Sequence, residues 1–198
     1  MALEAGSEVA AVVRPHSRRE GEVPPGCVIL YGDLEDSLRS ILDPADVVVF
    51  AAGSGSSTPE AATLSVDRDG AVRLVDDAAS VGVRRFVMLS SMGVDTPEFL
   101  PGPLRPYLRA KATADAHLQR SGMDHVILRP ARLTFDPGSG TASPSPDASI
   151  FMPISRDDVA AAIFWSVSHA PSGAVLELMG GNAPLERVLS RLGSGGRP

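Results

Sequence analysis

The sequence predicts an α/β fold, a parallel sheet with helices on both faces, and three observations lead to this prediction. Short runs rich in valine and isoleucine alternate with longer segments of helical periodicity. Several of the runs are apolar throughout, which is typical of strands that are covered on both faces. Repeated strand–helix–strand units connect by right-handed crossovers, and such crossovers produce a parallel sheet.

The expected elements follow from these patterns in chain order. Strands are expected at Glu8–Val13, Cys27–Tyr31, Asp46–Ala52, Arg85–Ser90, His125–Arg129 and Ala174–Met179. Helices are expected at Glu35–Leu42, Thr63–Val81, Tyr107–Ser121 and Ser155–His169. Ser155 with Asp158 forms a capping-box pattern that opens the last of these helices. The Gly-, Ser- and Pro-rich stretch Thr134–Ser149 indicates a lid or an irregular excursion, and Gly193–Pro198 indicates a frayed tail.

Composition limits the function classes. A chain of 198 residues with 43% apolar residues suits one folded domain, so residues 1–198 are assigned to a single domain. The net charge of −6 disfavours a nucleic-acid partner, and the absence of an apolar run near ~20 residues disfavours a membrane partner. Cys27 is the only cysteine, and the four histidines share no metal-ligand spacing, so no metal site is expected. The N-terminus lacks a secretion signal pattern, and we expect a cytoplasmic protein.

Tyr107 and Lys111 form the most informative motif. Residues four apart on a helix share a face. An ammonium group near a phenol favours the phenolate, so Lys111 is expected to lower the pKa of Tyr107 and make it a usable acid or base. The alternative is an ordinary exposed amphipathic face. Ser90 and Ser91 end a buried strand, at the edge where ligands bind in parallel sheets. One of these hydroxyls is expected to bind a substrate carbonyl, the alternative being a strand cap and a solvent-facing side chain.

The order of several segments resembles a known family. The runs Ala71–Gly93, Tyr107–Lys111, Val126–Leu133 and Ile154–Ala160 resemble the atypical short-chain dehydrogenase/reductases of the NAD(P)H-binding, NmrA-like type. The resemblance covers essentially the whole chain. It implies a Rossmann-like domain that binds NADP(H), with a serine–tyrosine–lysine site in some members. It also implies that Asp67 stands where extended relatives have an active-site asparagine. A different register of the same resemblance places Met92, instead of Ser91, at the catalytic position.

The same resemblance suggests cofactor contacts. Arg14 follows the expected strand that ends at Val13, where an arginine holds the 2′-phosphate of NADP, and Arg18 and Arg19 could add charge; a basic surface turn is the alternative. Asp33 faces the adenine in relatives and is equally suited to cap a helix. Further expected contacts with the cofactor come from small residues after a strand and from the end of another strand: Ala52, Gly53, Gly55, Arg129 and Pro130. Lys111 is also expected to hold the ribose.

The first strand and the glycine-rich loop of the family have no counterpart in this sequence. Residues Met1–Gly6 look like the last turn and cap of the family's first helix. Without the first strand, the second and fourth strands of the family lose their shared neighbour. Three explanations are open: a start set too far downstream, a decaying gene, or a sheet closed differently, either by direct pairing of the second strand with the fourth or through a second subunit of a homodimer. We favour the first.

The predicted function is an NADP-dependent oxidoreductase acting on a small carbonyl or alcohol. In this prediction Tyr107 is the acid or base, Lys111 and Ser91 or Ser90 assist it, and Asp67 links to Lys111 through water. The substrate pocket is expected to come from Arg132 and the loop Thr134–Ser149. The alternatives are a non-catalytic NADP(H)-sensing regulatory protein and a truncated, inactive product.

Overall fold

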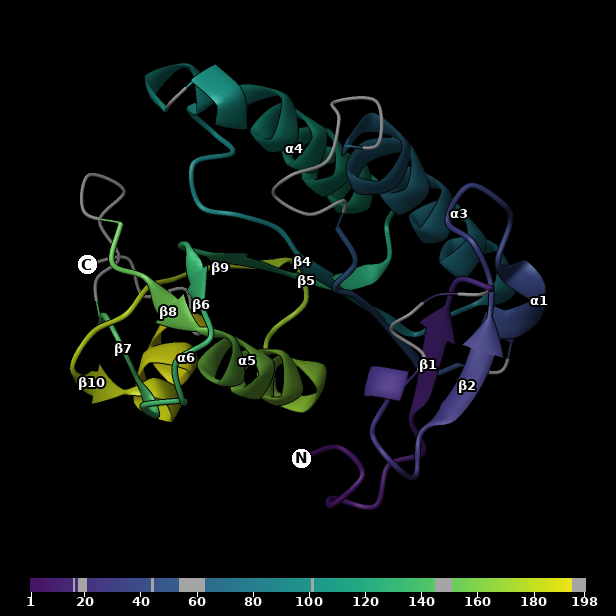
Figure 1. Ribbon diagram of the computed structural model, residues 1–198, viewed down its shortest axis with the longest axis horizontal. Coiled ribbons are helices and arrows are strands. Elements are labelled where there is room, and N and C mark those ends of the chain that lie inside the picture. Colours follow the sequence, from purple (N-terminus) through teal and green to yellow (C-terminus); the bar gives the residue numbers. More distant parts are fainter. Residues whose placement is uncertain are drawn as a thin grey trace.

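The main sheet has four parallel strands, seen in a computed structural model that describes residues 1–15, 17, 21–43, 45–53, 63–100, 102–144 and 151–193. These strands run in the order β3 (Val47–Phe50), β4 (Arg85–Leu89), β5 (Asp124–Pro130) and β9 (Ala174–Leu178). Helices lie on both faces of this sheet (Figure 1). The predicted α/β fold with a parallel sheet flanked by helices is therefore confirmed.

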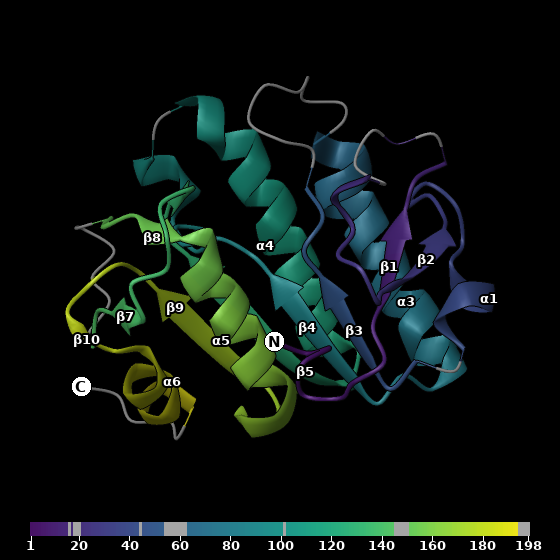
Figure 2. The same cartoon turned by 60° about the horizontal axis from the view of Figure 1, so that its bottom comes forward.

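A second, smaller sheet lies beside β3. It consists of β1 (Ala10–Val13) and β2 (Val28–Tyr31), which pair in parallel with Ala10 opposite Val28. Among the described strands, β1 pairs only with β2 and β3 pairs only with β4, so the two sheets stay separate (Figure 2). Val12 on β1 and Val49 on β3 keep 45% and 43% of their surface exposed. This arrangement corresponds to the expected second and fourth strands that lack a shared neighbour.

The N-terminal residues form one helical turn with a glycine cap. The amide of Ser7 donates to the carbonyl of Ala2, and Gly6 has a φ of 81°. A left-handed glycine with this hydrogen bond is the common way in which a helix ends. The turn leads directly into β1, as the pattern Met1–Gly6 indicates.

Helices α3 (Ala71–Val81) and α4 (Arg105–Arg120) cover one face of the main sheet, and α5 (Arg156–His169) and α6 (Leu185–Gly193) cover the other (Figure 1). A π-helix, η2 (Thr63–Gly70), precedes α3. Two 3₁₀ turns, η3 (Pro97–Phe99) and η4 (Gly102–Leu104), precede α4. Helix α6 was not predicted from the sequence, and its last residue, Gly193, was assigned to a frayed tail. None of the described helices is long and apolar enough to cross a membrane.

The first helix is shorter than predicted. It was expected at Glu35–Leu42, but α1 spans only Arg39–Leu42. The carboxylate of Asp77, on α3, accepts a hydrogen bond of 2.7 Å from the amide of Leu38. This contact satisfies an amide just before the helix begins and thereby fixes where α1 starts.

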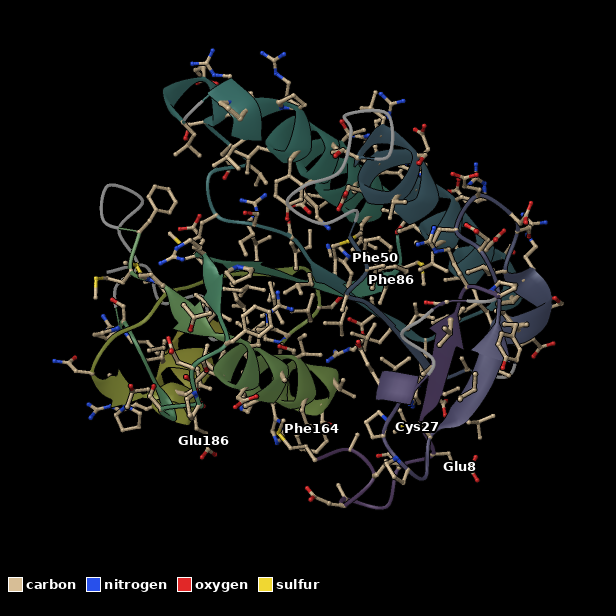
Figure 3. All side chains as sticks on the ribbon, viewed as in Figure 1. Glu8, Cys27, Phe50, Phe86, Phe164 and Glu186 are labelled. Atoms are coloured by element: carbon tan, nitrogen blue, oxygen red, sulfur yellow. The ribbon has the colours of Figure 1, made fainter. Side chains whose placement is uncertain are left out.

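Two apolar cores lie on the two faces of the sheet. Phe50 and Phe86 belong to the core under α3 and α4 and are 2% and 0% exposed (Figure 3). Val87, Leu176 and Leu189 belong to the core under α5 and α6. Successive residues of β4 alternate between the cores, and both faces are buried as its uniformly apolar sequence predicts.

The stretch Thr134–Ser149 holds short strands that the sequence did not predict. Strand β6 (Leu133–Thr134) pairs in parallel with β8 (Ile154–Ser155), and β7 (Thr141–Ala142) pairs antiparallel with β10 (Ala183–Pro184). The predicted cap of α5 is confirmed, because the side chain of Ser155 accepts a hydrogen bond from the amide of Asp158. Residues 145–150 lie outside the described part.

Candidate active site

Tyr107 and Lys111 lie one turn apart in the first half of α4. Pro106 suits the first turn of that helix because its missing N–H has no partner there. Tyr107 is half-buried, and Lys111 is only 3% exposed. The Lys111 ammonium is 5.9 Å from the centre of the Tyr107 ring. The two groups thus share a buried side of the helix, which removes the alternative of an exposed amphipathic face.

The contacts of Lys111 come from three different elements. Its Nζ is 3.3 Å from Oδ1 of Asp67 on the π-helix η2, and it donates to the carbonyl of Leu89 at the end of β4. The same ammonium lies 5.1 Å from the centre of the Phe50 ring at the end of β3. Asp67 is completely buried. The predicted water link between Asp67 and Lys111 is therefore wrong, since the two groups form a direct ion pair.

The prediction that the pKa of Tyr107 is lowered is also wrong. Burial raises the pKa of Tyr107 to about 12, and the negative charges of Asp67 and Asp115 act in the same direction. A hydrogen bond with Ser91 lowers the pKa but does not outweigh these effects. Burial likewise lowers the pKa of Lys111, while Asp67 favours its charged form. The phenol is consequently protonated at neutral pH and suited to donate a proton.

The two serines at the end of β4 have different partners. Ser90 is buried, and its hydroxyl donates to Oδ2 of Asp115 at 2.9 Å. Ser91 is half-buried, and its hydroxyl donates to the carbonyl of Met92 at 3.2 Å. Its side chain is also the serine that lowers the pKa of Tyr107. Met92 is 2% exposed and packs with Ala131 and Met179. The residue beside Tyr107 is therefore Ser91 rather than Ser90 or Met92.

Asp115 and Arg129 form a second buried group. Arg129 was predicted from the sequence as a site residue, but Asp115 was not. The Arg129 Nε donates to Oδ2 of Asp115 at 3.0 Å, and its Nη1 donates to Oδ2 of Asp95 at 2.6 Å. Arg129 is 8% exposed and was predicted to contact the cofactor, but these two carboxylates occupy its guanidinium group. The i+4 spacing from Lys111 was the available signal for Asp115. Pro130 is buried, and its carbonyl accepts from the amide of Met92.

Several of the predicted cofactor residues follow the carboxyl ends of β1, β2 and β3. Arg14 is exposed after β1, Asp33 is half-buried after β2, and Ala52 and Gly53 are exposed after β3. Asp33 accepts from the amide of Glu35 in a turn, but α1 begins only at Arg39, so the helix-capping role that was considered for Asp33 is wrong. A Cβ on Gly53 would lie 3.3 Å from Oδ1 of Asp67, a tighter contact than usual, so a small residue suits this place. Gly55, Arg18 and Arg19 lie outside the described residues.

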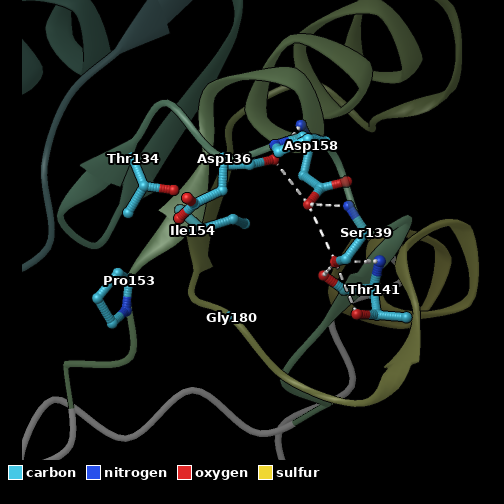
Figure 4. A pocket seen from close by; sticks show the side chains of 10 residues that line it. Thr134, Asp136, Ser139, Thr141, Pro153, Ile154, Asp158 and Gly180 are labelled. Carbon is cyan, nitrogen blue, oxygen red and sulfur yellow. Dashed lines mark hydrogen bonds between the residues drawn. The ribbon is translucent and has the colours of Figure 1, made fainter.

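A pocket of about 170 Å³ lies near the start of α5 (Figure 4). The loop Thr134–Ser149 contributes to its lining, whereas Arg132 does not. The lining includes Thr134, Asp136, Ser139, Thr141 and Asp158. Its lining also excludes Tyr107, Lys111 and Ser91. Among the described residues, no group of three or more histidine, cysteine or acidic side chains could hold a metal ion.

The fold and the site together define a dinucleotide-binding α/β protein with a tyrosine–lysine pair at the carboxyl edge of a parallel sheet. Residues 1–170 match the family model described as NAD(P)H-binding, and the chain belongs to this family. It is 35% identical to the "Uncharacterized sugar epimerase YhfK" of Bacillus subtilis, over 93% of this chain and 87% of the relative.

Two solved structures are also similar to this chain. A putative NAD-dependent epimerase/dehydratase from Bacillus halodurans is 34% identical, with a TM-score of 0.86, over 95% of this chain and 89% of the other. The oxidoreductase ylbE from Lactococcus lactis has a TM-score of 0.81 at 24% identity, over 94% of this chain and 85% of the other, and supports the fold alone.

Proposed function

We propose that this protein is an NADP(H)-dependent oxidoreductase that acts on a small carbonyl or alcohol. The observation that carries the proposal is the meeting of Ser91, Tyr107 and Lys111 at the carboxyl ends of β3 and β4. A hydroxyl, a protonated phenol and a buried ammonium are the groups that carbonyl reduction requires from a protein.

Each side chain has a separate task in the proposed reaction. The Ser91 hydroxyl binds the substrate oxygen and orients it toward the Tyr107 hydroxyl. The phenol donates its proton to that oxygen, which becomes the alcohol, and the Lys111 ammonium stabilises the phenolate that remains. Asp67 holds Lys111 in place. A nicotinamide supplies the hydride when it is bound.

The residues that would hold this cofactor lie along one edge. Gly53 leaves room beside Asp67, which suits a ring or ribose that lies close to the backbone. Arg14 is exposed at the end of β1, and its guanidinium matches the geometry of a 2′-phosphate. The preference for NADP(H) over NAD(H) rests on this arginine. Its test is Arg14→Ala, which should weaken NADPH binding and leave NADH binding unchanged.

The proposal includes a strand between β1 and β3. Each of these strands has one partner among the described strands, and Val12 and Val49 remain exposed beside the gap. We infer that a further strand and a glycine-rich loop fill the gap and hold the pyrophosphate. Residues 1–198 alone should then bind NADPH weakly or not at all. In-frame upstream codons for such a segment would support the inference, and micromolar NADPH binding by residues 1–198 would contradict it.

The test of catalysis is Tyr107→Phe in the longest in-frame form. NADPH affinity, measured by fluorescence titration, should be retained, while reduction of a panel of small aldehydes and ketones should be lost. Parent protein that binds NADPH but turns over no carbonyl or alcohol would instead indicate the regulatory binding protein. Absence of a cooperative thermal transition in residues 1–198 would indicate an inactive product.

A further inference from the structure

The buried carboxylate of Asp115 connects three elements at the edge of the site. Asp115 lies on α4, one turn beyond Lys111 and two turns beyond Tyr107. Its Oδ2 accepts from Ser90 at the end of β4 and from Arg129 on β5. Its Oδ1 has no hydrogen-bond partner among the described residues. All of its hydrogen bonds therefore run through a single oxygen.

Arg129 extends the connection to the loop that follows β4. Its guanidinium binds Asp115 through Nε and Asp95 through Nη1, and Asp95 lies four residues after Ser91. The strand ends themselves are held by backbone bonds, from the amide of Ser90 to Leu128 and from the amide of Met92 to Pro130. These backbone bonds join β4 to β5 but do not reach α4. The Ser90–Asp115 bond and the bond from Lys111 to Leu89 are polar links between α4 and this strand end.

We propose that Asp115, held by Arg129, is a positioning residue that keeps Ser90 out of the site and fixes the spacing between Ser91 and Tyr107. Ser91 is carried by the strand end and Tyr107 by α4. The link through Asp115 therefore determines how closely these two groups approach. The proposal deepens the proposed function, because it assigns the substrate-orienting hydroxyl to Ser91. Its test, however, requires neither cofactor nor turnover.

Two substitutions of Asp115 distinguish the loss of its hydrogen bonds from the loss of its negative charge. Asp115→Asn retains a carbonyl oxygen that can accept from both Ser90 and Arg129, and its NH₂ takes the place of the oxygen that has no partner. Asp115→Ala removes both bonds. The asparagine variant should therefore keep the spacing between Ser91 and Tyr107, and the alanine variant should lose it.

The experiment measures the Tyr107 phenol in cofactor-free protein with 3-fluorotyrosine. The background is Tyr31→Phe, which leaves Tyr107 as the only tyrosine and gives one ¹⁹F resonance. The pH titration of that resonance is recorded with and without Ser91→Ala. Ser91→Ala should raise the pKa in the parent and by a similar amount with Asp115→Asn. With Asp115→Ala the shift caused by Ser91→Ala should largely disappear.

Ser90→Ala is the second variant, needed if Asp115→Ala does not fold. It removes the link at the strand end while Asp115 keeps its bond to Arg129, and it should also reduce the shift caused by Ser91→Ala. The proposal would be overturned if Ser91→Ala raised the pKa of Tyr107 as much in the Asp115→Ala background as in the parent. If Asp115→Ala is unfolded, the same result in the Ser90→Ala background would overturn it. Failure of NADPH binding would contradict the proposed function and leave this result unchanged.

Discussion

At the scale of single residues, the buried ion pair between Lys111 and Asp67 places two charges in the protein interior. The side chains are 3% and 0% exposed. A buried charge without its partner is strongly unfavourable, whereas removal of both charges has a smaller effect. The pair therefore contributes to stability mainly through the penalty that either partner alone would suffer.

Lys111→Met should lower the free energy of unfolding by about 3–5 kcal/mol, because it leaves Asp67 buried without a counter-charge. The double variant Lys111→Met/Asp67→Asn should be more stable than Lys111→Met alone. Urea denaturation at pH 7 measures both values. A double variant no more stable than the single one would show that the pair is not coupled in this way.

The raised pKa of Tyr107 predicts a loss of stability at high pH. The phenol has a pKa of about 12 in the folded protein, against an ordinary value of 10.0. For a group whose pKa is raised by folding, the contribution is complete below the unfolded value and is lost as the pH rises through the folded value. Stability should therefore fall between pH 10 and 12. Urea denaturation at several pH values should find a shallower decline in Tyr107→Phe, with Tyr31→Phe as the matched control. Equal slopes in the two variants would argue against the raised pKa.

At the scale of elements, hydrogen bonds to the first turn of α5 hold the loop that precedes this helix. The Asp158 carboxylate accepts from the amides of Ser139 and Gly140 and from the hydroxyls of Ser139 and Ser155. Burial acts to raise the pKa of Asp158, but these hydrogen bonds outweigh it, and the net effect is a lowered pKa. The pocket in Figure 4 is bordered by this loop and by the carboxylate that holds it.

Asp158→Ala should destabilise the protein by about 1–3 kcal/mol at pH 7, because it leaves the buried Ser155 hydroxyl and the part-buried amides of Ser139 and Gly140 without their acceptor. The lowered pKa means that this stabilisation is present above the unfolded value and is lost as the pH falls through the folded value. The difference from the parent should therefore shrink when urea denaturation is repeated near pH 3. Asp157→Ala, which removes one exposed bond to Gly138, is the matched control and should change stability by less than about 0.5 kcal/mol. Equal effects of the two substitutions would be inconsistent with the structure.

Much of this architecture was predictable from local patterns, because strands buried on both faces have uniformly apolar sequences. Helix α6 was missed although Leu185, Val188 and Leu189 have helical spacing and are buried. The choice between Ser90 and Ser91 could not be made from the sequence, since it depends on Asp115, which reaches the strand end from another element. The direction of the Tyr107 pKa shift depends on burial and on Asp67, and neither is encoded in the spacing of Tyr107 and Lys111.

At the scale of the whole molecule, the separation of the two sheets predicts unequal local stability. A pair of strands without a third neighbour is marginal by itself, whereas β4 and β5 are flanked on both sides and deeply buried. Amides of β1 and β2 should exchange with deuterium faster than those of β4 and β5. Hydrogen-exchange mass spectrometry measures this difference. Equal protection of the two sheets would show that they unfold as one unit.

The same separation has a consequence for how a dinucleotide would be recognised. Arg14 and Asp33 extend from the two-stranded sheet, while Gly53, Lys111 and Tyr107 belong to the body built on the four-stranded sheet. In the proposed binding mode the adenosine end and the nicotinamide end of one molecule contact different bodies. Such a ligand connects the two bodies. Binding of one end then strengthens binding of the other only if the bodies keep the spacing that the intact dinucleotide requires. Tight capture of the intact dinucleotide would then measure how rigidly the two bodies are connected.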